Sequence, residues 1–403
     1  MFAVAYHIER IRSEIPALAG GPAFFDSPGG TQLPAPVIEA MVAAMSAPLS
    51  NRTTLTEGGR NAERITIEAR AAMADLLGAA PERVVFGRSA TMLTFDLART
   101  LAFGWAPGDE VVVTRLDHDG NIRPWVIAAE RAGATVRFCD FDPESGELTP
   151  QHLRKVVTED TVLVALPGAS NLIGTVPDLP ALVRIGHEVA AHVHIDAVHL
   201  AAHRRVDLAA LGADTLTTSP YKLCGPHLGV LTAAPDAIDE LRPDKLLPSP
   251  DIVPERFELG TLPYELLAGL PAVADWLAGL DDAATGTRSE RLDVSLAAAE
   301  QHEDALAMQL LEALPDLPGV TNLSRAADRT PTTLLIFDEI SAAEVAQQLA
   351  GERIQAPAGH FYAWEASHRL GLRDAGGLRI GFAPYNDAAE VERLVRALAT
   401  ATS

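Results

Sequence analysis

The chain has 403 residues, of which 48% are hydrophobic and 21% charged, with a formal net charge of -22 at pH 7 and a sequence pI near 4.9. This acidic balance argues against nucleic acid and acidic membrane surfaces as partners, because no basic stripe is available to neutralise phosphates. Cys139 and Cys224 cannot form a disulfide framework and lack metal-site spacing, so a reducing cytoplasm is the expected location and no metal is expected. Neither a secretory signal nor a membrane span is expected.

Between about residues 23 and 230, helical and strand-like segments alternate along the chain. Amphipathic helices are predicted at 59–79, 91–102, 122–134 and 180–192, and strands at 83–86, 109–114, 135–141, 161–167 and 193–199. Short apolar strands separated by helices are typical of a mostly parallel sheet that helices cover on both faces.

After about Gly260 the pattern changes to long helices rich in Ala, Leu and Glu. A helix at 292–314 precedes an isolated strand at 332–337 and a final amphipathic helix at 389–399. This order predicts a smaller C-terminal α+β lobe.

Lys222 lies in TTSPYKLCGPHLGVL, residues 217–231, between turn-forming residues and a short apolar run. A lysine at such a junction is ordinarily an exposed amine. The motif IDAVH, residues 195–199, changes that interpretation because it places Asp196 and His199 at the end of another predicted strand. Ligand crevices in sheets of this kind lie at the carboxyl ends of the strands.

Three further strand ends carry polar groups. GRSATML, residues 87–93, offers backbone N–H groups at a helix start for a phosphate, although an ordinary helix cap explains it equally well. RLDHDGNIRPW supplies His118, and ASNLIGT supplies Asn171. Together these features describe a pyridoxal 5'-phosphate site, in which a lysine of lowered pKa forms a Schiff base and an acid keeps the ring nitrogen protonated.

Taken in order, these motifs resemble the class V aminotransferase family of fold-type I pyridoxal phosphate enzymes, and most of all its cysteine desulfurase and selenocysteine lyase branch. The resemblance runs from FFDSPGGTQLP to PYNDAAEVERLV. It implies an α/β fold with a mostly parallel seven-stranded sheet sandwiched by helices and a smaller C-terminal α+β domain. The implied boundaries are residues 18–262 for the large domain, and residues 1–17 with 263–403 for the small one.

The resemblance also assigns roles to individual residues. Lys222 would be the Schiff-base lysine, Asp196 the partner of the ring nitrogen, and His118 the ring that stacks on the cofactor. The other implied cofactor contacts are Ala90, Thr91, Asn171, His199, Ser219 and Tyr221, the last standing where the desulfurases more often have histidine. RFELGT, residues 256–261, implies a homodimer in which Thr261 reaches the phosphate site of the partner.

The substrate contacts come from the C-terminal motifs. LRIGFAPYN implies that Arg379 binds the substrate α-carboxylate, a role that suits a planar guanidinium. In QAPAGHFYAWEASHRLG, Tyr362 stands at the position of the desulfurase cysteine, and the substrate wall would include His360, Phe361, Tyr362 and Trp364. Without that thiol, persulfide chemistry is not expected.

What remains is chemistry at the Cα of an amino acid, with Lys222 as the general base. We therefore expect first a C–S lyase that eliminates a thiol from a cysteine S-conjugate. Transamination, epimerisation, and decarboxylation-coupled deamination of a cysteine S-conjugate, as in lincosamide-type tailoring, stay open, and true cysteine desulfuration ranks last. A dehydrogenase or an ATP-binding enzyme is disfavoured because GxGxxG and GxxxxGK[ST] are missing; a non-catalytic cofactor-binding scaffold is the remaining rival.

Overall fold

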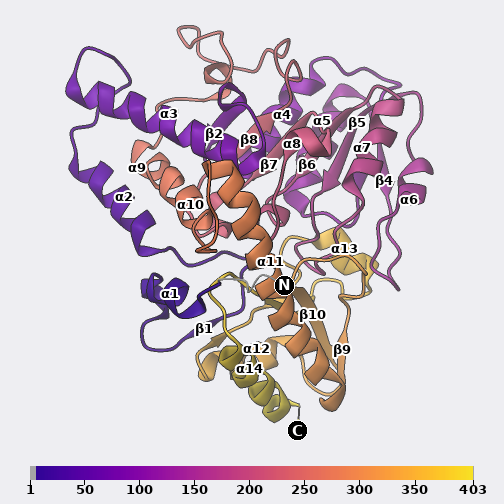
Figure 1. Cartoon of the computed structure of the whole chain (residues 1–403). Coiled ribbons are helices and arrows are strands. Elements are labelled where there is room, and N and C mark those ends of the chain that lie inside the picture. Colours follow the sequence, from indigo (N-terminus) through magenta and orange to yellow (C-terminus); the bar gives the residue numbers. More distant parts are fainter. Residues whose placement is uncertain (1–5, 403) are drawn as a thin grey trace.

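The fold of residues 6–402, which are the part of the chain that the computed structural model describes, consists of two lobes built on separate sheets (Figure 1). The large sheet has the strand order β2-β8-β7-β6-β5-β3-β4. Its strands are β2 (Val84–Gly87), β3 (Glu110–Thr114), β4 (Thr135–Cys139), β5 (Thr161–Pro167), β6 (His192–Asp196), β7 (Thr215–Thr218) and β8 (Gly229–Ala233). Only β8 runs antiparallel to its neighbours β7 and β2, so the expected mostly parallel seven-stranded sheet is confirmed.

Helices cover both faces of this sheet because successive strand residues point to opposite sides. Val111 and Val113 of β3 pack with α4 and α5, whereas Val112 belongs to the core that includes α3 and α7. The helices of this lobe are α2 (Ala35–Ser46), α3 (Glu57–Leu77), α4 (Ala90–Ala102), α5 (Arg123–Ala132), α6 (Pro150–Arg154), α7 (Leu179–Glu188), α8 (Leu208–Leu211), α9 (Tyr264–Leu267) and α10 (Gly269–Leu277). The helix predicted at 59–79 corresponds to α3 and ends at Gly78, which adopts a left-handed conformation with φ 60°.

The second lobe lies below the first in Figure 1 and holds a four-stranded antiparallel sheet of order β12-β13-β10-β9. Its strands are β9 (Val320–Asn322), β10 (Thr332–Phe337), β12 (Ala358–Gly359) and β13 (Gly377–Gly381), and β1 (Ala23–Phe24) pairs separately with β11 (Ile354–Gln355). The helices here are α11 (Arg288–Ala313), α12 (Ala342–Gly351), α13 (Trp364–Arg369) and α14 (Ala388–Ala401). The strand predicted at 332–337 is confirmed as β10, but it is not isolated, because it pairs with the short strands β13 and β9.

The N-terminal helix α1 (Ile8–Ser13) touches the segments that follow both sheets. Arg12 forms an ion pair of 3.1 Å with Glu390 of α14, and Arg10 donates to the carbonyl oxygen of Gly279 after α10. Helix α10 itself packs on α2 and α3 of the large lobe. The exact domain boundaries stay a prediction.

The helices of residues 6–402 include none that combines the length and the apolar character needed to cross a membrane. In the same range, no three or more His, Cys, Asp or Glu side chains are grouped as metal ligands.

Gly229 at the start of β8 allows the chain before α4 to approach closely. A Cβ at this position would overlap the backbone of Ser89 and Ala90, which cannot move as a side chain can. We expect Gly229→Ala to lower the free energy of unfolding by about 2 kcal/mol and to displace the first turn of α4. Urea unfolding measures the loss, with Gly351→Ala as the control because a Cβ at Gly351 meets nothing within 4 Å. Equal stability of the two variants would contradict this packing.

Candidate active site

One cavity lies where the carboxyl ends of the strands of the large sheet meet. Its lining residues are Ser89, Ala90, Thr91, Asp117, His118, Gly120, Ala169, Asn171, Asp196, Val198, His199, Ser219, Tyr221 and Lys222. All the cofactor contacts expected from the sequence line it except Thr261. Adjacent parallel strands end at the same edge, which is why segments far apart in the sequence converge here.

Lys222 ends a short 3-10 turn, Pro220–Lys222, that follows β7. Thr31 fixes this turn from the N-terminal segment: its N–H and its hydroxyl both donate to the Tyr221 carbonyl oxygen, at 3.0 and 2.9 Å. The Cys224 N–H in turn donates to Thr31 Oγ1 at 2.7 Å. Lys222 is only 6% exposed. Burial, and then the positive charge of Arg379, lower the pKa of Lys222 to about 8, so about a tenth of the amine is neutral at pH 7, far more than for an ordinary lysine.

Two buried carboxylates face the cavity near this amine. Asp196 ends β6 and accepts a hydrogen bond of 2.9 Å from the Val198 N–H, and burial raises its pKa. Burial and the nearby charge of Asp196 raise the pKa of Asp117 as well, although Asn121 Nδ2 donates to it at 2.7 Å. A cationic group next to Asp196 would relieve the cost of keeping this carboxylate charged, so the pair suits a protonated ring nitrogen.

His118 presents a neutral imidazole to the cavity. Burial, followed by the charges of Lys222 and Arg379, lowers its pKa to about 3. The Gly120 N–H donates to His118 Nδ1 at 2.9 Å, which leaves the proton on Nε2. A neutral ring with a fixed tautomer can lie against an aromatic cofactor without adding charge to the site.

The first turn of α4 forms an anion-binding end of the cavity. Ser89 caps this helix by accepting a hydrogen bond of 3.2 Å from the Met92 N–H, and Ala90 and Thr91 begin the turn. The unpaired N–H groups and the positive end of the helix dipole favour a phosphate here. Gly229 on β8 provides the room for this backbone.

Among the residues that line the cavity, two have a buried polar atom with no partner within the described part of the chain. His199 Nε2 lies 3.0 Å from the hydroxyls of both Thr330 and Thr332, while its Nδ1 is unpaired. Asn171 Nδ2 donates to the Phe361 carbonyl oxygen at 2.9 Å, while its Oδ1 is unpaired. Buried polar atoms are normally satisfied, so these two point to a polar ligand group that they would hold. The residues present therefore fit pyridoxal 5'-phosphate: the first turn of α4 would hold its phosphate, and His118 and Asp196 would contact its ring.

Arg379, on β13 of the small lobe, is buried at the edge of the site. It donates to Asp26 Oδ1 at 2.6 Å and to the Asn171 carbonyl oxygen at 3.1 Å, and its Nε is unpaired. The Phe361 ring covers its guanidinium at 3.7 Å from the ring centroid. The arginine is thus preorganised for a carboxylate, with Asp26 as its partner in the substrate-free chain.

Besides Arg379, three predicted residues lie outside the lining of this cavity. Tyr362 is 70% exposed, with its ring centroid 5.6 Å from that of His118, so it stands at the entrance. His360 is half-buried and its Nδ1 has no partner among the described residues. Thr261 is exposed and borders a second cavity together with Asn51, which its hydroxyl contacts at 3.4 Å. Their substrate and cofactor roles stay predictions.

Four residues that the structure brings to the site had no role assigned from sequence: Asp26, Asp117, Thr330 and Thr332. Asp117 directly precedes His118, and Asp26 lies in the motif FFDSPGGTQLP. Their positions in or beside these motifs could have indicated that both residues belong to the site. No local signal exists for the threonines, which reach His199 from more than 130 residues along the chain.

Residues 23–394 match the family model for aminotransferase class V. The chain belongs to this family. The uncharacterized protein MT3887 of Mycobacterium tuberculosis is 33% identical over 399 residues, which span 98% of this chain and 100% of that protein. The crystal structure of the cysteine desulfurase CsdA from Escherichia coli superposes with a TM-score of 0.86 at 25% identity, covering 98% of both chains. A mutant of C-DES with glycine covalently linked to its PLP cofactor has the same fold, with a TM-score of 0.80, 21% identity, and coverage of 96% of this chain and 98% of that one.

The lowered pKa of Lys222 predicts how fast the apoprotein captures pyridoxal 5'-phosphate. Only the neutral amine attacks an aldehyde, so the rate should rise with pH to a midpoint near 8, rather than near 10.5 as for an ordinary lysine. Stopped-flow absorbance measures this rate. Arg379→Gln removes a cation that lowers the pKa, so its midpoint should lie higher. A wild-type midpoint near 10.5 would contradict the burial argument.

Proposed function

We propose that this protein is a C–S lyase that acts on a cysteine S-conjugate. The cofactor is pyridoxal 5'-phosphate, as in the class V aminotransferase family to which the chain belongs. The observation that carries the proposal is a buried Lys222 of lowered pKa in a cavity that no cysteine lines. Overall, the S-conjugate and water would give a thiol, pyruvate and ammonia.

The bound cofactor supplies an electron sink for the electron pair left at the substrate Cα. Ala90 and Thr91 would hold its phosphate, and Asp196 would keep its ring nitrogen protonated. His118 would lie on the ring, the unpaired His199 Nδ1 would donate to the phenolic oxygen, and the unpaired Asn171 Oδ1 would accept from the phenolic hydroxyl.

Lys222 then has two tasks. Its amine would attach the cofactor, and when free it would remove the substrate Cα proton as general base. A base with a pKa near 8 is well matched to neutral pH. Arg379 would bind the substrate carboxylate. That carboxylate would replace Asp26 as the partner of the guanidinium, or would share the guanidinium with Asp26.

Neither thiol of the chain is placed to accept sulfur as a persulfide. Cys139 ends β4 and Cys224 lies in the core below the Lys222 turn, and both are almost completely buried. Burial raises the pKa of each thiol to about 12, so neither is a thiolate at neutral pH. The sulfur would leave with its own substituent, which favours an S-conjugate over free cysteine.

The residues at the entrance support a substrate with a bulky sulfur substituent. Phe361 and Tyr362 adopt left-handed backbone conformations, with φ 51° and 57°, which direct the chain across the mouth of the site. The Tyr362 carbonyl oxygen accepts a hydrogen bond of 2.7 Å from the Asp119 N–H, which ties this turn to the loop of His118. An apolar substituent could pack on these rings.

The active form would be a homodimer in which Thr261 reaches the partner's phosphate site. The support is a group of exposed apolar side chains at and around the second cavity. Leu247 is 97% exposed and Leu259 is 60% exposed, and Leu246 and Ile252 line the same cavity as Thr261. Exposed apolar side chains gathered at one place are typical of an interaction surface.

A panel of cysteine S-conjugates with alkyl, aryl and sugar substituents tests the proposed reaction. We expect equal amounts of thiol and pyruvate from the preferred conjugate, measured by mass spectrometry and a coupled pyruvate assay. Lys222→Ala should lower the rate by about a thousandfold or more, because the base is gone. Arg379→Lys should raise KM more than it lowers kcat, because a lysine cannot form the bidentate contact.

The same panel separates the competing reactions. Conversion of plain amino acids to keto acids with no thiol released would replace this proposal by transamination. Release of carbon dioxide from the conjugate would replace it by decarboxylation, and formation of alanine with enzyme-bound persulfide would identify a desulfurase.

A further inference from the structure

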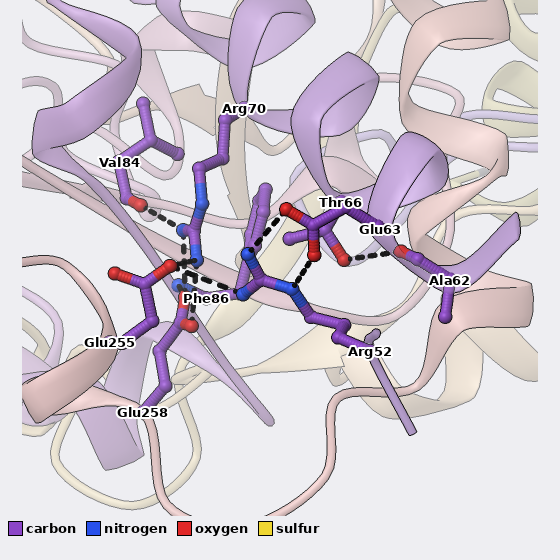
Figure 2. A network of polar contacts seen from close by, with 9 residues as sticks. All are labelled: Arg52, Ala62, Glu63, Thr66, Arg70, Val84, Phe86, Glu255 and Glu258. Carbon is purple, nitrogen blue, oxygen red and sulfur yellow. Dashed lines mark hydrogen bonds and ion pairs between the residues drawn. The ribbon is translucent and has the colours of Figure 1, made fainter. Parts of the chain in front are cut away.

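A buried ion pair joins helix α3 to the segment that ends at Thr261 (Figure 2). Arg70 of α3 donates from its two terminal nitrogens to the two carboxylate oxygens of Glu258, both at 2.8 Å. Both side chains are less than a tenth exposed. This bidentate geometry fixes the orientation of Glu258 as well as its position.

The pair also provides hydrogen-bond partners for backbone groups at one edge of the large sheet. Strand β2 is one of the two edge strands, and Val84 and Phe86 direct their backbone groups away from β8. Arg70 donates to the Val84 carbonyl oxygen, and the Phe86 N–H donates to Glu258 Oε1 at 2.9 Å. Glu258 is therefore bonded at once to α3 and to the strand that leads into the loop before α4.

Glu258 is the last buried residue before an exposed tripeptide. Leu259, Gly260 and Thr261 all face solvent, and Gly260 has φ 83° with open space around it. Within the described residues, the Thr261 side chain makes one hydrogen bond, a long contact of 3.4 Å to Asn51 Oδ1. The position of Thr261 thus depends on how firmly Glu258 is held.

A second bridge holds the same segment from the other side. Arg52 donates to Glu63 of α3 at 2.7 Å and to Glu255 at 3.1 Å, and Glu255 precedes Glu258 by one turn (Figure 2). This bridge is more exposed than the Arg70–Glu258 pair and holds the start of the segment, not its end.

We propose that Arg70 and Glu258 are positioning residues that place Thr261 for the phosphate site of the partner subunit. This inference rests on the homodimer of the proposed function. A buried ion pair adds little net stability compared with an apolar pair of the same size, so its value here lies in fixing geometry. Loss of the ion pair should therefore change the partner's site more than the site of the same chain. Strand β2 of the same chain is also held by its pairing with β8, whereas the tripeptide after Glu258 has no comparable support.

Mixed dimers assign this effect to one site. Two chains with different affinity tags are co-expressed, and dimers containing one of each are isolated; Lys222→Ala in one chain leaves a single lysine to attach the cofactor. In arrangement A, Glu258→Gln is in the Lys222→Ala chain, so the working site keeps its own β2 but receives Thr261 from the altered chain. In arrangement B, Glu258→Gln is in the chain that carries Lys222.

The readout is the dissociation constant of pyridoxal 5'-phosphate, from the absorbance of cofactor attached at Lys222. We expect arrangement A to bind about tenfold more weakly than a mixed dimer without Glu258→Gln, because one charge-assisted contact is lost. Arrangement B should differ by less than about twofold. Arg70→Lys should reproduce both results. The matched control is Arg64→Gln, which breaks an exposed pair with Glu68 on the same helix and should change neither.

Unchanged affinity in arrangement A, or a greater loss in B than in A, would overturn the inference while leaving the proposed reaction intact. Isolation of the tagged mixed dimers shows that the variant chains fold and associate. If sedimentation finds the wild-type chain monomeric, the homodimer of the proposed function is wrong, and the inference is overturned with it.

Discussion

Burial of the Lys222 amine is the constraint on which the rest of the site depends. An ammonium group is costly to remove from water, so burial lowers the pKa of Lys222 to about 8 and leaves a usable fraction of neutral amine. The amine must then be fixed beneath the cavity. The sheet positions the Lys222 turn because β6 and β7 end side by side, with Asp196 paired to Thr217. Thr31, from a distant part of the chain, holds the turn by a hydrogen bond to the Tyr221 carbonyl oxygen.

The same N-terminal segment connects the two lobes at the site. Asp26 binds Arg379 on β13, five residues before Thr31 holds the Lys222 turn. His199 likewise reaches from the large lobe to Thr332 at the start of β10. The cavity around Lys222 and the surroundings of Arg379 therefore depend on one arrangement of both lobes, and the polar atoms buried at the junction form hydrogen bonds across it.

Much of the site follows from the rule that parallel strands end at one edge. His118, Asn171 and Asp196 each lie at or just after a predicted strand, and the structure brings them to one cavity. The rest depends on contacts between distant segments, such as Asp26 with Arg379, separated by 353 positions. The second sheet was underestimated for a related reason: its edge strands, such as β9 (Val320–Asn322), are stabilised by pairing and carry no pattern of their own.

The central claim is that one buried amine carries the cofactor. Borohydride reduction of the protein with bound pyridoxal 5'-phosphate, followed by peptide mass mapping, tests this directly. We expect the pyridoxyl mass addition on the peptide that contains Lys222, and we expect Lys222→Ala to lose it. Label at another lysine, or none on a folded protein saturated with the cofactor, would contradict it.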